Sequence, residues 1–131
     1  MEKDNNQTES FREPKLEFSE EVSTNIIEDL KKIPKGTSGF VVIKGPNVGE
    51  KFFLTNDEVS IGRSPESGIF LDDITVSRQH AILEKTEKGF KLIDTGSLNG
   101  TYVNGDRAES TLLQNGDRIQ IGKYVFLFFK L

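Results

Sequence analysis

The sequence predicts an all-β domain, a sandwich or barrel of antiparallel strands, behind a polar N-terminal tail. Three observations favour this fold class. Short apolar or alternating segments follow one another from residue 40 to residue 130. Turn signals built from Gly, Asn, Asp and Pro separate these segments at intervals of roughly ten residues. After residue 36, no segment shows the apolar period of a helix.

The first 37 residues differ from the rest, because they are rich in charged residues and poor in apolar ones. Such a segment cannot bury enough surface to offset its ordering entropy, so we expect a mostly disordered tail over residues 1–37 and a folded domain over 38–131. Four apolar residues of this tail recur at helical spacing: Val22, Ile26, Leu30 and Ile33. They predict a short helix over 25–33, capped by Asn25 and ended by Pro34. Such a short helix is marginal on its own.

The expected strands follow the linker 34–39 in order. They cover residues 40–44, 51–55, 58–62, 68–71, 80–86, 90–92, 101–103, 118–121 and 124–130. Each is bounded by turn residues, as in Gly45-Pro46-Asn47-Val48-Gly49 between the first two strands. The segment 80–86 shows the clearest alternation, with apolar Ala81 and Leu83 on one face. The spacing of the strands therefore favours a single β-domain without internal repeats.

Composition excludes several classes of function. The net charge of −4 argues against a general nucleic-acid binder, because phosphate backbones select basic surfaces. There is no cysteine, hence no disulfide framework and no cysteine-based metal site. The longest apolar run, 124–129, is too short to span a bilayer, and the polar first residues carry no signal peptide. We expect a cytoplasmic monomer without contacts to membrane or nucleic acid.

Four residues at turns between expected strands suggest a site for one phosphate on a peptide: Arg63, Ser77, Arg78 and Asn99. A guanidinium presents a planar fork that matches two phosphate oxygens. A hydroxyl and a second cation beside it would complete the phosphate site. The amide of Asn99 has both a donor and an acceptor, so it can hold a peptide main chain in both directions.

Taken alone, each of these residues has a plainer explanation. Arg63 would pair with a nearby carboxylate, Asp72 or Asp73. The pair Ser77-Arg78 would be a turn serine followed by a solvated arginine, and Asn99-Gly100 would be a hairpin turn. Their joint occurrence at this spacing is what favours a binding site.

His80 is the only histidine of the chain. It has no cysteine or second histidine as a partner, so we expect a structural role in which it bonds the loops that hold Ser77 and Gly62. No residue of the constellation is a plausible nucleophile, and no set of metal ligands accompanies it. We therefore expect a protein that is not an enzyme and that has neither a metal nor a cofactor.

The motif residues resemble the forkhead-associated (FHA) domain family over about residues 38–131. The matching residues are Gly62-Arg63, Ser77-x-x-His80 and Asn99-Gly100, supported by Asn104-Gly105. The resemblance implies a β-sandwich of about eleven strands that binds phosphothreonine peptides with loops at one end. Carried over by position, it implies that Arg63, Ser77 and Arg78 contact the phosphate and that Asn99 holds the peptide backbone. Gly62, His80 and Gly100 would shape the loops.

Two longer runs, 69–78 and 96–104, are similar to small actinobacterial FHA regulators of 2-oxoglutarate metabolism, of the GarA and OdhI type. That resemblance implies a tail threonine that a Ser/Thr protein kinase phosphorylates and that the protein's own domain then binds. It also implies enzymes of 2-oxoglutarate and glutamate metabolism as partners. The tail departs from the family pattern of two adjacent threonines, because here Glu21 is followed by Val22-Ser23-Thr24. We expect phosphorylation at Thr24, with Thr8 as the alternative.

Two functions remain open from the sequence. The first is a phosphothreonine-binding regulator that is switched when its own phosphorylated tail occupies the site. The second is an adaptor that recruits phosphorylated partners, with the tail as a spacer. A phosphatase built on Arg63, Arg78 and His80 fails for want of a nucleophile, and the clustering of the motifs argues against a β-domain without a pocket.

Overall fold

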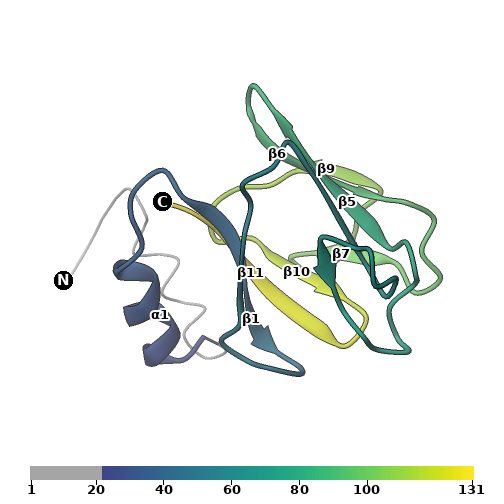
Figure 1. Ribbon diagram of the computed structural model, residues 1–131, viewed down its shortest axis with the longest axis horizontal. Coiled ribbons are helices and arrows are strands. Elements are labelled where there is room, and N and C mark those ends of the chain that lie inside the picture. The colour runs from purple at the N-terminus through teal and green to yellow at the C-terminus, as the bar shows by residue number, and fades with distance from the viewer. Residues whose placement is uncertain (1–21) are drawn as a thin grey trace.

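Residues 22–131, the part of the chain that the computed structural model describes, form two packed β-sheets with one helix on the outside (Figure 1). The six-stranded sheet has the order β2 (Lys51–Phe53), β1 (Ser38–Lys44), β11 (Tyr124–Lys130), β10 (Arg118–Ile121), β7 (Thr101–Val103) and β8 (Asp106–Arg107). The five-stranded sheet has the order β4 (Ile69–Phe70), β3 (Glu58–Gly62), β5 (Ala81–Thr86), β6 (Gly89–Asp94) and β9 (Ser110–Leu112). The eleven strands confirm the predicted sandwich.

Two details of the sheets differ from the sequence prediction. Strands β8 and β9 were not expected, because two or three residues between turns carry no readable alternation. The pair β3–β4 is parallel, with Ile61 opposite Ile69, whereas the other paired strands run antiparallel. The expected hairpin at Asn104-Gly105 joins β7 to β8, and both residues have positive φ, as a two-residue hairpin turn requires.

The main core lies between the two sheets and is built around aromatic rings. Phe40 packs against Phe126 and Phe128, with ring centroids 5.2 and 5.9 Å apart. The other sheet supplies aliphatic side chains such as Ile61 and Leu83. This packing fixes the position of one sheet relative to the other, and it thereby fixes the positions of the loops at their ends.

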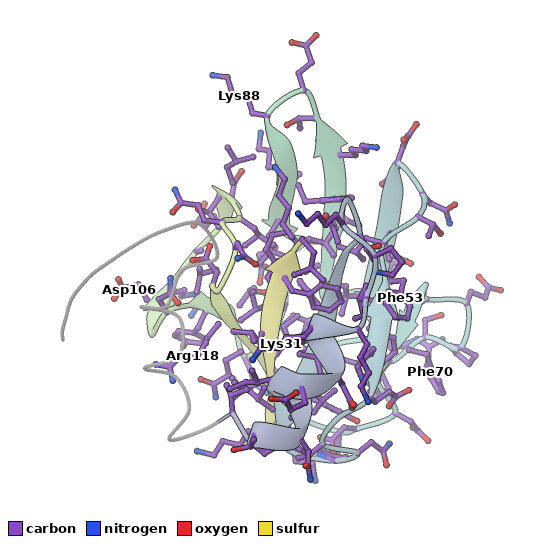
Figure 2. All side chains as sticks on the ribbon, turned by 90° about the vertical axis from the view of Figure 1, so that its left-hand side faces the viewer. Lys31, Phe53, Phe70, Lys88, Asp106 and Arg118 are labelled. Atoms are coloured by element: carbon purple, nitrogen blue, oxygen red, sulfur yellow. The ribbon has the colours of Figure 1, made fainter. Side chains whose placement is uncertain are left out.

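Strands β1 and β11 are buried on both faces. Phe40 and Val42 face the main core, whereas Val41 and Ile43 face outward into a second cluster. Helix α1 (Thr24–Lys31) covers this outer face and completes the second cluster (Figure 2). Its members are Val22, Ile26, Leu30, Val41, Ile43, Leu127 and Phe129. The helix therefore gains its stability from packing against the sheet rather than from its own propensity.

The helix differs in detail from its prediction. It spans Thr24–Lys31, and its N-cap is Ser23, whose Oγ accepts a hydrogen bond from the Ile26 amide at 3.2 Å. The expectation that Asn25 caps the helix is therefore wrong, because the cap is the residue before the first helical turn. An ion pair of 3.3 Å between Lys51 and Asp29 also joins β2 to the helix.

Thr8 and the rest of residues 1–21 lie outside the described residues. Within residues 22–131, no helix has the length and apolar character needed to cross a bilayer. The same residues contain no group of three acidic or histidine side chains that could hold a metal ion.

Candidate functional site

Backbone hydrogen bonds bring the loop after β3 beside the loop before β5. The Arg63 amide donates to the Ser77 carbonyl at 2.9 Å, and the Ser64 amide donates to the Arg78 carbonyl at 3.1 Å. Gly62 permits this approach, because a Cβ there would lie 2.1 Å from the Arg78 carbonyl oxygen. The need for glycine at this position thus comes from close contact and not from a left-handed backbone, because Gly62 is not among the residues with positive φ.

The two arginines keep most of their donors available. The Arg63 side chain is partly buried, and its Nε donates to the Val76 carbonyl at 3.0 Å. A guanidinium has five N–H donors, so the two terminal nitrogens remain for an anion. The Arg78 side chain is exposed and makes no ion pair within residues 22–131. The alternative pairing of Arg63 with Asp73 is not formed, because Asp73 pairs with Lys123 at 2.9 Å.

Ser77 and Asn99 connect this pair of loops to a third loop, which follows β6. The Ser77 Oγ accepts from the Leu98 amide at 3.0 Å, so its hydroxyl hydrogen remains available to donate. The Asn99 Nδ2 donates to the Thr75 carbonyl at 3.1 Å. In this structure Asn99 therefore holds the chain's own backbone, while its Oδ1 remains to accept from a peptide amide.

His80 lies fully buried beneath the three loops. Its Nδ1 accepts from the Ser77 amide at 3.1 Å, and its Nε2 lies 2.9 Å from the Gly100 carbonyl. An amide must donate and a carbonyl must accept, so the ring is the neutral tautomer with its proton on Nε2. The ring thus joins the loop of Ser77 to the loop of Asn99. Gly100 turns that second loop with a φ of +89°.

The Asp94 carboxylate organises the loop after β6 and was missed by the sequence reasoning. It accepts from the amides of Gly96 and Ser97 at 2.8 and 2.9 Å, and also from the hydroxyls of Ser97 and Thr101. Burial opposes ionisation of Asp94, but these hydrogen bonds outweigh burial and lower its pKa to about 2. The available signal was Asp94 directly before Thr95-Gly96-Ser97, a sequence typical of an Asx turn.

Because of Asp94, the free energy of unfolding should decrease as the pH falls into the acid range. Its pKa in the folded chain lies below the ordinary value of 3.8, so its stabilisation is present above pH 4 and is lost as the pH falls toward 2. Replacing Asp94 by Asn should lower the unfolding free energy at pH 7 by about 1–3 kcal/mol and flatten its decline in acid. Urea unfolding between pH 7 and pH 2.5 measures both effects. Asp106→Asn, in exposed β8, is the control, and equal acid slopes for Asp94→Asn and the parent would contradict the assignment.

A groove of about 380 Å³ adjoins the site. Its lining residues are Thr75, Asn99, Gly100, Tyr102, Gln120, Gly122 and Lys123. The hydroxyl of Thr75 accepts from the Lys123 amide at 3.0 Å and donates to Asp73. Hydrogen bonds from Thr75 and Lys123 lower the pKa of Asp73 to about 2, and the Asp73 carboxylate raises the pKa of Lys123. Lys123 is thus a third cation near the site, which the sequence reasoning missed.

The FHA domain family model matches residues 59–122, the segment that contains all three loops. A solved FHA domain, studied for its phosphothreonine-dependent interactions, superposes with a TM-score of 0.67 at 25% sequence identity. That similarity covers 72% of this chain and 97% of the solved one. The fold and the matched segment define an FHA-domain protein, which confirms the resemblance of the motif residues.

Two curated relatives narrow the class. A protein of Corynebacterium jeikeium named oxoglutarate dehydrogenase inhibitor is 48% identical over 99 residues, which are 76% of this chain and 69% of the relative. The glycogen accumulation regulator GarA of Mycolicibacterium smegmatis is 46% identical over 102 residues, 78% of this chain and 65% of the relative. The chain belongs to this family of small FHA regulators, which are inhibitors and regulators rather than enzymes.

Proposed function

We propose that this chain binds phosphothreonine peptides at the site formed by Arg63, Ser77, Arg78 and Asn99. The observation that carries the proposal is the backbone pairing that sets Arg63 beside Ser77 and Arg78 while leaving terminal guanidinium groups available. Two guanidinium groups and one hydroxyl are thus available on neighbouring loops at one end of the sandwich. Hydrogen bonds to a charged group contribute roughly 1.5–3 kcal/mol each, so the phosphate supplies much of the binding energy.

The partner that this proposal favours is an enzyme of 2-oxoglutarate or glutamate metabolism. The C. jeikeium relative is named as an inhibitor of oxoglutarate dehydrogenase, which supports this class of partner. A Ser/Thr protein kinase would supply the phosphothreonine, on the partner or on the chain's own tail. Thr24 is the candidate in the described residues, because it is exposed at the first position of α1.

A switch through Thr24 has a structural requirement that the sequence did not reveal. A peptide held by Asn99 needs free main-chain groups, whereas the residues after Thr24 use theirs within α1. Self-binding therefore requires α1 to leave the sheet and to expose Ile26 and Leu30, at about 1.5–3 kcal/mol each. A short tether gives an effective concentration on the order of millimolar, which for a micromolar site contributes about 4 kcal/mol against this cost. We propose that phosphorylation of Thr24 makes α1 leave the sheet, so that the tail around Thr24 occupies the phosphothreonine site of the same chain.

One observation favours the adaptor as a second candidate function. In the structure, α1 is docked on the outer face of β1 and β11 and holds Thr24 within helical backbone. If that docking persists after phosphorylation, the loops stay open to phosphorylated partners, and the tail acts only as a spacer.

One titration tests the proposed function. A peptide of residues 18–30 phosphorylated at Thr24 should bind the chain about 100-fold more tightly than its unphosphorylated twin, as two charge-assisted contacts predict. Ser77→Ala should weaken binding of the phosphopeptide, while the far-ultraviolet circular dichroism spectrum of the chain stays unchanged. Isothermal titration calorimetry provides the affinities. Equal binding of the two peptides would contradict recognition of a phosphothreonine at position 24.

The same assay separates the two candidates. The chain phosphorylated at Thr24 should bind external phosphopeptide at least ~10-fold more weakly than the unphosphorylated chain if its own tail occupies the site. Undiminished binding would favour the adaptor.

A further inference from the structure

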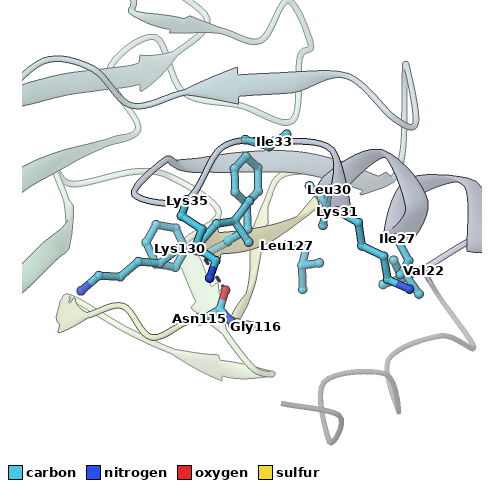
Figure 3. A pocket seen from close by; sticks show the side chains of 13 residues that line it. Val22, Ile27, Leu30, Lys31, Ile33, Lys35, Asn115, Gly116, Leu127 and Lys130 are labelled. Atoms are coloured by element: carbon cyan, nitrogen blue, oxygen red, sulfur yellow. Dashed lines mark hydrogen bonds between the residues drawn. The ribbon is translucent and has the colours of Figure 1, made fainter. Parts of the chain in front are cut away.

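An apolar groove lies between α1 and the outer face of β11, away from the three loops (Figure 3). Its volume is about 440 Å³. Figure 3 shows Val22 and Ile27 at one end, Leu127 in the middle, and Lys35 and Asn115 at the other end. The floor is held in place by two hydrogen bonds, from the Gly116 amide to the Phe128 carbonyl at 2.8 Å and from the Lys130 amide to the Asn115 side chain at 2.8 Å.

The walls of the groove are apolar and only partly covered. Leu30 and Phe129 are buried, but Ile27, Ile33 and Leu131 remain partly exposed beside them. The helix therefore covers only part of the outer face of the sheet. A concave apolar surface of this size is a site that another chain segment can fill.

We propose that the groove is filled by the chain's own residues 16–21, with Phe18 as the anchor and Leu16 beside it. The described part of the chain begins at Val22, which is 2% exposed and lines one end of the groove. The preceding residues therefore emerge at the groove itself. This inference does not depend on the proposed phosphothreonine site.

The reach of the segment matches the length of the groove. Val22 follows Phe18 by four positions, and an extended chain of four residue steps spans about 14 Å. From Leu127 to Leu131 the floor also covers four residue steps, about 13 Å of extended chain. A phenylalanine four residues before Val22 can therefore reach either end of the apolar floor.

The charges on the two sides are complementary. Lys31, Lys35 and Lys130 line the groove. The segment that enters it is acidic, with Glu17, Glu20 and Glu21 around its apolar residues. The apolar side chains of the segment can pack in the groove while its carboxylates lie near the lysines at the groove edge. These charges favour binding of this segment over binding of a neutral apolar one.

The test is nuclear magnetic resonance on the full chain. Nuclear Overhauser contacts should join the Phe18 ring to the methyl groups of Leu127 and Leu131. Phe18→Ser should abolish these contacts, shift the amide resonances of Gly116 and Leu131, and lower the melting temperature by a few degrees. Phe11→Ser, which removes a phenylalanine of the same tail, is the matched control and should leave the groove amides in place.

Reversing the charge of one lysine at the edge of the groove tests whether electrostatic attraction helps to hold the segment. Lys35→Glu should weaken the contacts of Phe18, whereas Lys91→Glu, the same change on β6 outside the groove, should not. Absence of Phe18 contacts in the native chain, or unmoved groove amides in Phe18→Ser, would overturn the proposal. Groove resonances that move with protein concentration would also overturn it, because the occupant would then be a second copy of the chain.

Discussion

Replacing Arg63 by alanine should lower the affinity for a phosphothreonine peptide by about 100-fold or more while leaving the sandwich folded. In the proposed binding mode, the variant loses a charge-assisted contact to the phosphate worth roughly 1.5–3 kcal/mol. It also loses the Nε bond to the Val76 carbonyl, which helps to hold the loop that carries Ser77. Both losses weaken peptide binding, so the decrease in affinity should exceed the decrease caused by removing a surface cation.

Two further variants sharpen the measurement. Arg63→Lys keeps the charge but removes the planar fork, so its affinity should fall between those of the parent and of Arg63→Ala. Lys91→Ala removes a cation from exposed β6 and should bind as the parent does. Calorimetric titration gives the affinities, and thermal unfolding verifies the fold. An Arg63→Ala variant with the parent's affinity would mean that the phosphate binds elsewhere.

Replacing His80 by alanine should be the most destabilising single change at the site, lowering the melting temperature by roughly 10–20 °C. The ring is fully buried and satisfies both the Ser77 amide and the Gly100 carbonyl. Each buried group left unpaired costs about 1–3 kcal/mol, and the vacated volume adds a further penalty. The loss would appear in both stability and peptide affinity, because the same ring positions two binding loops.

Thermal unfolding followed by circular dichroism measures this effect. Gln79→Ala is the matched control, because its side chain is exposed and its backbone carbonyl still accepts from the Thr95 hydroxyl. A His80→Ala variant that melts with the parent would show that the two loops are held by other contacts.

Much of the sandwich was predictable, because most strands alternate or are bounded by strong turn residues. The apolar run 124–129 has no polar face. Tyr124, Phe126 and Phe128 face the main core, whereas Leu127 and Phe129 face α1. A strand without a polar face must pack against other elements on both sides. The helical spacing of Val22, Ile26 and Leu30 indicated a segment that could pack against the second side.

The rest of the site was not predictable, because it depends on contacts between distant segments. Lys123 reaches Asp73 and Thr75 only after β10 and β11 have placed the turn between them beside the loop before β5. Gly62 is required by the approach of a carbonyl sixteen residues later, at Arg78. Single-sequence patterns report local backbone preferences, and neither contact has a local signature.

The pairing of β1 with β11 has a consequence for how the molecule forms. Ser38 lies opposite Lys130, so the first strand of the domain pairs with its last. During translation, β1 and the helix before it leave the ribosome early and must wait for β11, which supplies Leu127 and Phe129 to the second cluster. Closing so long a loop makes folding slow for a domain of this size. The face that seats α1 is therefore one of the last parts of the newly made chain to become complete.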